Sequence, residues 1–238
     1  MVQLERENTV KSVKFDRNLA TLEAGPMRPK KFAQRESGSR FRFRSSDGRD
    51  IAPEEWLGMW AALYPRKYNS EHDKLIAIRE PLSATHFVRI GKWKDSAETE
   101  SKWKPNVASV AYPIWMQAAS ELPRCPDESR VADFLQDWSE RKYTDRFTSR
   151  EVQKQFGLSR ATTLLYFISG QRFPIFDSRV VRAMKRLLNS SVPNDVRWYI
   201  DSFRPLFREI AGLCGTENVR MVDKALFSYG DRNLEFPD

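Results

Sequence analysis

Apolar residues recur at spacings of three and four along most of the chain from Ile51 onward, and this periodicity constrains the fold more than any other feature. In the segment 129–142, for example, Val131, Leu135 and Trp138 fall on one face of a helix. Proline and glycine separate such segments, and the period of two expected of a strand is confined to residues 40–44. The sequence is therefore predicted to be all-α.

The length and composition are those of a folded protein with a distinct N-terminal region. The chain has 238 residues, of which 40% are hydrophobic, enough for one large domain or for two lobes that share a core. Residues 1–50 are predicted to be a basic arm or tail, and residues 51–238 a helical domain. Within 28–49 arginine alternates with phenylalanine, which permits an arm that follows phosphates and stacks on bases. A flexible tail, or a strand packed on the body, fits the same residues.

The formal net charge is +8 and suits an anionic partner such as nucleic acid, although solubility alone accounts for many charges of this size. Two cysteines, Cys125 and Cys214, and two histidines, His72 and His86, are too few for an iron–sulfur cluster or a typical zinc site. No metal and no cofactor are therefore predicted. No apolar run reaches the roughly 20 residues of a membrane span, so we expect no membrane association and a reducing, cytoplasmic location.

One stretch, FGLSRATTLLYFISGQRFPIFDSRVVRAM (156–184), begins with a glycine turn, continues as an apolar helix and has an aspartate before a second helix. The preceding residues 148–155 are predicted to form a short helix, FGLS a tight turn, and RATTLLYFIS a second helix. A turn of this kind exposes backbone N–H groups at a helix N-terminus, where they suit a phosphate oxygen. Gly157 has no side chain to obstruct a nucleic-acid backbone.

Asp177 directly precedes the helix predicted to begin at Ser178. Aspartate is a favoured N-cap, which would account for the residue without any chemistry. A carboxylate at the mouth of a helix can also be catalytic, and the two roles are compatible. The spacing alone leaves both interpretations open.

Together, the turn and the segment RFPIFDSRVVRAM resemble the helix-hairpin-helix superfamily of DNA glycosylases, of which endonuclease III is a member. The resemblance covers 148–188 and is nearest to uncharacterised bacterial members, whose upstream "WK" matches Trp103–Lys104 here. It implies a two-lobed helical fold, a helix-hairpin-helix at about 148–170, and duplex DNA as the partner. It also identifies Asp177 with the family's essential aspartate.

The chain departs from the family pattern at three positions. Phe156 replaces the proline of the hairpin, Ser159 its second glycine, and Ala161 the lysine that lyase members use. Without that amine no Schiff base forms, so the resemblance implies a monofunctional glycosylase in which Asp177 steadies an oxocarbenium-like sugar and orients a water. The residues expected to contact DNA are Gly157, Ser159, Arg160, Thr162 and Arg179.

Other interpretations of the same residues stay open. Tyr166, Trp138 and His86 are candidates for a pocket around a flipped base, but they fit core packing at least as well. The altered hairpin favours a module that has lost catalysis and binds nucleic acid or a protein. A third possibility is an unrelated helical interaction protein.

Overall fold

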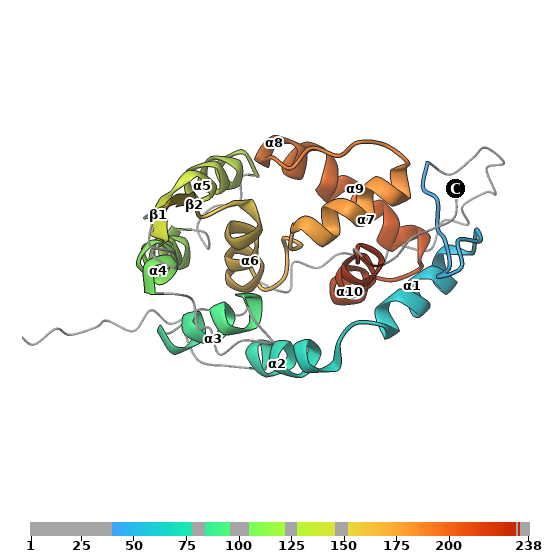
Figure 1. Cartoon of the computed structure of the whole chain (residues 1–238), viewed down its shortest axis with the longest axis horizontal. Coiled ribbons are helices and arrows are strands. Elements are labelled where there is room, and N and C mark those ends of the chain that lie inside the picture. The colour runs from blue at the N-terminus through green and yellow to red at the C-terminus, as the bar shows by residue number, and fades with distance from the viewer. Residues whose placement is uncertain are drawn as a thin grey trace, which may run out of the picture.

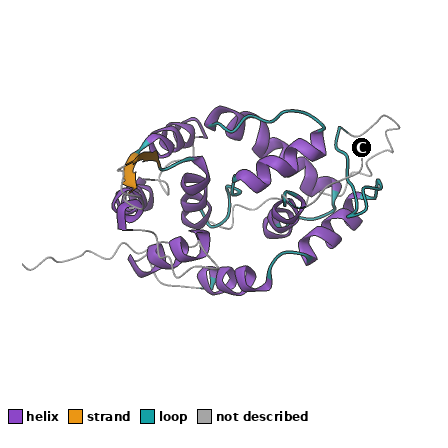
Figure 2. Ribbon diagram, viewed as in Figure 1, coloured by secondary structure: helices purple, strands orange, loops and turns teal. Residues whose placement is uncertain are grey.

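The structure is a computed structural model, and it describes residues 40–77, 84–95, 105–121, 128–145, 152–231 and 233. Most of these residues are helical, which confirms the prediction of a helical protein (Figure 2). The one sheet among them is an antiparallel pair of short strands. In chain order the elements are α1 (Pro53–Ala62), α2 (Arg66–Ile76), α3 (Ala84–Asp95), α4 (Pro105–Glu121), α5 (Glu128–Glu140), β1 (Lys142–Asp145), β2 (Val152–Gln155), α6 (Leu158–Ile168), α7 (Ser178–Leu188), α8 (Val196–Trp198), the π-helix η3 (Tyr199–Phe203), α9 (Arg204–Leu213) and α10 (Val219–Tyr229).

The helices form two groups that lie side by side in Figure 1. One contains α3–α6 with the two strands, and the other contains α1, α7, α9 and α10. The segment 169–177 leads from α6 in the first group to α7 in the second. Asp177, the last residue of this segment, therefore lies where the chain enters the second group.

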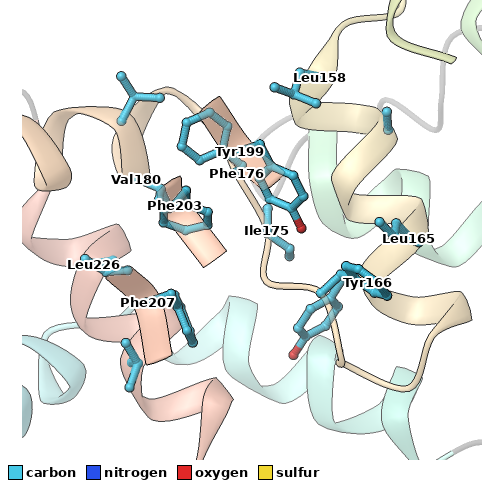
Figure 3. Close-up of a cluster of buried hydrophobic side chains, with 14 of the residues drawn as sticks. Leu158, Leu165, Tyr166, Ile175, Phe176, Val180, Tyr199, Phe203, Phe207 and Leu226 are labelled. Carbon is cyan, nitrogen blue, oxygen red and sulfur yellow. The ribbon is translucent and has the colours of Figure 1, made fainter. Parts of the chain in front are cut away.

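The connecting segment is part of the core. Ile175 and Phe176 point into the apolar space between α6 and the C-terminal helices (Figure 3). The Phe176 ring lies 4.8 Å from that of Phe203 and 5.7 Å from that of Tyr199, centroid to centroid. Such aromatic contacts bury a large apolar area in preferred tilted geometries. They fix the backbone immediately before Asp177.

Helix α7 shows how the sequence determines these elements. Its buried residues are Val180, Val181, Ala183, Met184 and Leu187, at the three- and four-residue spacing of one apolar face. It packs on α10, whose C-cap Gly230 lies against the first turn of α7. A Cβ at Gly230 would lie 1.8 Å from the Arg179 carbonyl oxygen, so only glycine allows this approach.

Residues 40–45 pack on the body. The Phe41 and Phe43 side chains are buried, and the Phe43 ring makes an edge contact with Trp56 at 5.3 Å. Of the three interpretations of this alternating segment, packing on the body is correct for 40–45, and these two rings are not available to stack on bases. The body therefore begins before residue 50, the predicted end of the arm. Residues 1–39 lie outside the described residues.

The predicted short helix at 148–155 is wrong where the structure describes it. Val152–Gln155 is strand β2, paired with β1 so that Tyr143 faces Lys154. The Phe156 N–H extends the pairing by donating to the Arg141 carbonyl at 2.7 Å. Four residues are too few for helical propensity to outweigh tertiary hydrogen bonds. The helix that precedes the Gly157 turn is α5. The antiparallel strands β1 and β2 lie between α5 and this turn in the chain.

Candidate site at the N-terminus of helix α7

Asp177 is the N-cap of α7 and is also one half of an ion pair. Its Oδ1 accepts hydrogen bonds from the backbone N–H groups of Arg179 at 3.0 Å and Val180 at 3.1 Å. Its Oδ2 accepts from Nζ of Lys94, on α3, at 3.1 Å. The Asp177 and Lys94 side chains are 15% and 12% exposed, respectively. The carboxylate is therefore held on both sides, in a side chain that is largely buried.

The environment of Asp177 favours its charged form. Burial alone would raise the pKa of the carboxyl, but the Lys94 ammonium and the two backbone amides outweigh it and lower the pKa below the ordinary 3.8. The group is thus ionised at neutral pH. Such a carboxylate is a weak base, but it can stabilise positive charge that develops nearby.

The segment that carries Asp177 is anchored from both helical groups. The Phe176 N–H donates to Thr162 Oγ1 on α6 at 3.1 Å, and the Tyr199 hydroxyl donates to the Pro174 carbonyl at 2.9 Å. The Arg204 guanidinium lies 4.2 Å from the centre of the Phe173 ring. Because these anchors come from different elements, they determine where α7 begins.

Thr162 was predicted to contact DNA, and the structure gives it another role. The side chain is fully buried, and its hydroxyl donates to the Leu158 carbonyl at 3.0 Å while accepting from Phe176. A hydroxyl engaged in this way holds the connecting segment and does not reach a ligand outside the protein. The motif residue is therefore structural here.

Gly157 is the N-cap of α6, and its backbone has a conformation that only glycine adopts readily, at φ 85° and ψ 150°. No side chain caps the helix, and its first turn contains no acidic residue. The Gly157 N–H itself donates to the Ser139 carbonyl at 2.9 Å. Ser159, two residues on, is half-buried, and its carbonyl accepts from the Thr163 hydroxyl. The turn therefore presents the positive end of a helix, but one of its amides is used internally.

The two predicted arginine contacts lie at different helix ends. Arg160 donates from Nη1 to the Phe156 carbonyl at 3.0 Å and lies over the Tyr143 ring, next to the Gly157 turn. Arg179 lies in the first turn of α7, with its guanidinium 4.2 Å from the centre of the Phe227 ring. Its side chain is 37% exposed, and its Nη1 lies 3.7 Å from Oδ2 of Asp231, with which it forms an ion pair. Arg179 is therefore the predicted basic contact that shares a helix turn with Asp177.

The three candidates for a base pocket are core residues. Trp138 and Tyr166 are fully buried, and His86 is nearly so. Trp138 stacks on Phe134, and the Tyr166 hydroxyl lies 2.8 Å from Nε2 of His72 and donates to Gln171 Oε1 at 3.0 Å. The core interpretation, which the sequence favoured, accounts for their positions.

The sequence did not identify a second ion pair in the same region. Arg220 on α10 donates from Nη1 to Asp223 Oδ2, and the two side chains are 9% and 7% exposed. The Arg220 guanidinium lies 4.6 Å from the Tyr64 ring centre and 5.9 Å from that of Trp93. An Arg–Asp pair three residues apart is usual on an exposed helix face, so the pair itself gave no sign of burial. The apolar residues around it in α10 were the one signal that this helix face is buried. Lys94 was not identified either, since it was one of several lysines in an irregular segment.

The two ion pairs influence each other. Burial raises the pKa of the Asp223 carboxyl; Arg220 counteracts this shift, and the negative charge of Asp177 adds to it. Burial likewise raises the pKa of Tyr64 to about 12, and both aspartates contribute to that shift. Lys94, Asp177, Arg220, Asp223, Tyr64 and Trp93 are called the inter-helix cluster below.

Comparison with protein-family models, with curated proteins and with solved structures found no match for this chain. Among the described residues, no group of three or more histidine, cysteine, aspartate or glutamate side chains is placed to hold a metal ion. Within the same residues, every helix is too short or too polar to cross a membrane.

Proposed function

We propose that the protein binds DNA and acts as a monofunctional DNA glycosylase of the helix-hairpin-helix type. The observation that carries this proposal is Asp177: an ionised carboxylate at a helix mouth, in a side chain that is 15% exposed, on a segment anchored from both helical groups. The arrangement of the helices in two groups joined at this segment supports the two-lobed fold that the sequence resemblance implies. The net charge of +8 supports an anionic partner.

In the proposed reaction a nucleotide is flipped out of the duplex so that its sugar lies beside Asp177. The bond between C1′ and the base breaks, and the electrons leave with the base. The carboxylate stabilises the positive charge that develops on the sugar. A water molecule adds its oxygen to C1′, and its proton neutralises the departing base. Because the pKa of Asp177 is lowered, its role is charge stabilisation and water orientation rather than strong base catalysis.

The DNA backbone would be held by the two helix N-termini. The first turn of α6 has no capping side chain, which leaves donors and a positive dipole end for a phosphate. Arg160 beside this turn supplies positive charge, and Arg179 beside Asp177 would do so by exchanging its ion pair with Asp231 for a phosphate. Lys154, exposed on β2 directly before the turn, adds another.

A second candidate function is a DNA- or protein-binding module with the same fold and no catalysis. The specific observation in its favour is the Gly157 N–H, which donates to Ser139 inside the protein and is not available to a phosphate. The fully buried Phe156 in place of the family's proline points the same way. This candidate predicts salt-sensitive DNA binding with no release of base from any substrate.

The test is release of free base from a panel of duplexes, each with one damaged, deaminated or mismatched nucleotide. We expect the wild-type chain to release base from at least one duplex, and the Asp177→Asn variant to lose about 100-fold or more in rate, as for removal of a key charge-stabilising group. Asparagine caps a helix as well as aspartate does, so the substitution removes charge while keeping the cap.

The matched control is Asp195→Asn, because Asp195 is also an N-cap, accepting from the Trp198 N–H at 2.7 Å, and lies outside the inter-helix cluster. Its activity should equal that of the wild type. Full activity of Asp177→Asn would rule out the mechanism. Salt-sensitive binding with no base release from the whole panel would favour the binding module.

A further inference from the structure

The described residues surround an open hollow of about 300 Å³ at the C-terminal end of α7, the end of this helix opposite to Asp177. Segments that are far apart in the sequence line it: residue 40, the end of α7 with the loop after it, η3 with the residue before it, and the start of α9. Its polar and aromatic lining consists of Arg40, Ser190, Ser191, Trp198, Asp201 and Ser202, and the rest of the lining is aliphatic. A volume at the lower end of those seen for ligand sites suits one ring system with its substituents.

One wall of the hollow is the π-helix η3, and Pro205 explains why the helix is wide there. Pro205 has no N–H for the carbonyl of Asp201, four residues earlier, so α-helical hydrogen bonding is interrupted at this turn. The N–H of Arg204 donates instead to the Tyr199 carbonyl, five residues back. Such π-turns are rare and are frequently found at functional sites. This one places Asp201 and Ser202 together at the hollow.

Trp198 is the outermost ring of an aromatic stack. Its ring lies 6.1 Å from that of Phe203 at an interplanar angle of 26°, and 5.6 Å from that of Phe176 at 32°, centroid to centroid. Both phenylalanines are buried in the core shown in Figure 3, whereas Trp198 is half-buried and lines the hollow. A flat ring that packs on the open side of Trp198 would extend this stack. Aromatic side chains hold the bases of unpaired nucleotides in this way.

Asp201 supplies hydrogen-bond acceptors at the hollow. Its Oδ2 lies 3.7 Å from Nε of Arg197, which is an ion-pair distance but too long for a hydrogen bond. The Asp201 and Arg197 side chains are 64% and 92% exposed, so this pair is weak and leaves the carboxylate oxygens available. An ionised carboxylate has only acceptors and binds best to two N–H groups that lie side by side. Among the DNA bases only guanine has such a pair, N1–H and N2–H, on its Watson–Crick edge.

Basic residues at the edge of the hollow suit a phosphate. Arg40 and Arg42 are both exposed, on either side of the buried Phe41. Glu209 accepts hydrogen bonds from Nε and Nη2 of Arg40. Arg42 forms no ion pair with a described residue, and its backbone N–H donates to the Leu187 carbonyl at 2.7 Å, which holds it beside the end of α7. Exposed arginines of this kind bind phosphate oxygens.

We infer that the hollow binds the guanine base of a nucleotide. The base packs on Trp198, its N1–H and N2–H groups donate to Asp201, and its phosphate lies toward Arg40 and Arg42. The site is at the other end of α7 from Asp177 and needs no base release, so the inference goes beyond the proposed function. The base comes from a free nucleotide or from an unpaired position in a DNA strand, because base pairing covers the edge that Asp201 contacts.

The test compares GMP with IMP, which lacks only the 2-amino group. Binding to the full chain is measured by isothermal titration calorimetry at low salt. We expect IMP to bind about 10-fold more weakly than GMP, within the range for one side of a bidentate contact. AMP should bind no more tightly than IMP. Guanosine, which has no phosphate, should also bind more weakly than GMP, and this difference should shrink as salt is added.

Variants test the two residues that contact the base. Asp201→Asn removes one of the paired acceptors, so the preference for GMP over IMP should disappear. The matched control is Asp137→Asn, because Asp137 also pairs with an arginine four residues away, Arg141, but lies on α5 outside the hollow; it should keep the preference. Trp198→Ala should weaken GMP and IMP alike by about 10-fold, through the loss of stacking. The comparison of GMP with IMP needs no substitution, so it stands even if Trp198→Ala does not fold.

Single strands of thymidine nucleotides with one central guanine or hypoxanthine distinguish the two sources of the base. A preference for guanine in the strand, lost when a complementary strand pairs it, would identify an unpaired DNA base. A preference for GMP over IMP without a preference between the strands would identify a free nucleotide. No preference for guanine in either form would overturn the inference, and so would an Asp201→Asn variant that keeps the preference. Either result leaves the base-release assay of Asp177 unaffected.

Discussion

Asp177 and Asp223 each form an ion pair with a basic residue in the same part of the molecule, yet the pKa values of the two carboxyls shift in opposite directions. Asp177 lies at the mouth of α7, where two backbone amides donate to it in addition to Lys94. Asp223 lies inside α10, where the backbone N–H groups bond to carbonyls of their own helix, and Arg220 is its bonded partner.

The difference shows that a paired cation does not by itself keep a buried carboxylate charged. Both residues have a cation within hydrogen-bonding distance. At Asp177 the charge of Lys94 lowers the pKa most, the two backbone amides add to this effect, and together they outweigh burial. At Asp223 burial prevails, and the nearby charge of Asp177 adds to its effect. Asp177 is thus suited to stabilise positive charge, and Asp223 to hold Arg220 in place.

The largest effect on stability is expected for Asp223→Ala. It leaves the Arg220 guanidinium buried without a counter-ion, and breaking a buried pair on one side costs about 4 kcal/mol. The free energy of unfolding, from urea titrations monitored by tryptophan fluorescence, measures it. The double variant Arg220→Met/Asp223→Leu lacks both charges. We expect its free energy of unfolding to be within about 1 kcal/mol of the wild-type value. A single variant as stable as the double would contradict this account of the pair.

Asp177→Ala should cost less, about 3 kcal/mol, because Lys94 can move toward solvent when its partner is lost. About 1 kcal/mol of this is the lost cap, so Asp177→Asn, which keeps the cap, should cost about 2 kcal/mol. Asp195→Ala serves as the control for a cap without an ion pair and should cost about 1 kcal/mol. An equal loss for Asp177→Ala and Asp195→Ala would show that the Lys94 pair adds nothing.

Thr162→Val should cost about 2 kcal/mol, because it leaves the buried Phe176 N–H without an acceptor. Thr163→Val is the matched control. Thr163 is equally buried on the same helix, but its hydroxyl bonds only to the Ser159 carbonyl, and its loss should cost less than about 1 kcal/mol. The same urea titrations compare the two. Similar losses would mean that Thr162 does not anchor the segment leading to Asp177.

The helices with strong local signals were predictable from the sequence. Helix α7 has an aspartate N-cap, an apolar face at regular spacing and a left-handed C-cap at Asn189, and each of these is a local property. Asp177 as a cap followed from its position alone. Strand β2 was not predictable because its four residues are held by pairing with β1, which lies seven residues earlier in the chain.

The partners at the candidate site were not predictable for a similar reason. Lys94 and Asp177 are 83 residues apart, and no spacing rule relates them. Thr162 matched a motif position, but its role is to accept a hydrogen bond from the Phe176 N–H, and this contact forms only because the segment with Phe176 folds back against α6. Local patterns therefore identified the carboxylate, while the tertiary fold determines what surrounds it.

The smallest expected effect, and the sharpest test of the comparison, is the dependence of stability on pH. The pKa of Asp177 is lowered on folding, so its contribution is present above the unfolded value of about 3.8 and is lost as pH falls through the folded pKa. The pKa of Asp223 is raised, so its contribution is present below about 3.8 and is lost as pH rises through the folded pKa. The two groups therefore act in opposite directions.

Urea titrations between about pH 2.5 and pH 6 on the wild type, Asp177→Asn and Asp223→Asn can separate the two. The stability of wild type relative to Asp177→Asn should grow with pH in the lower part of this range. Relative to Asp223→Asn it should shrink with pH in the upper part. If both differences grew with pH, the carboxyl inside α10 would be held charged as firmly as the one at the mouth of α7. The helix terminus would then not be what distinguishes them.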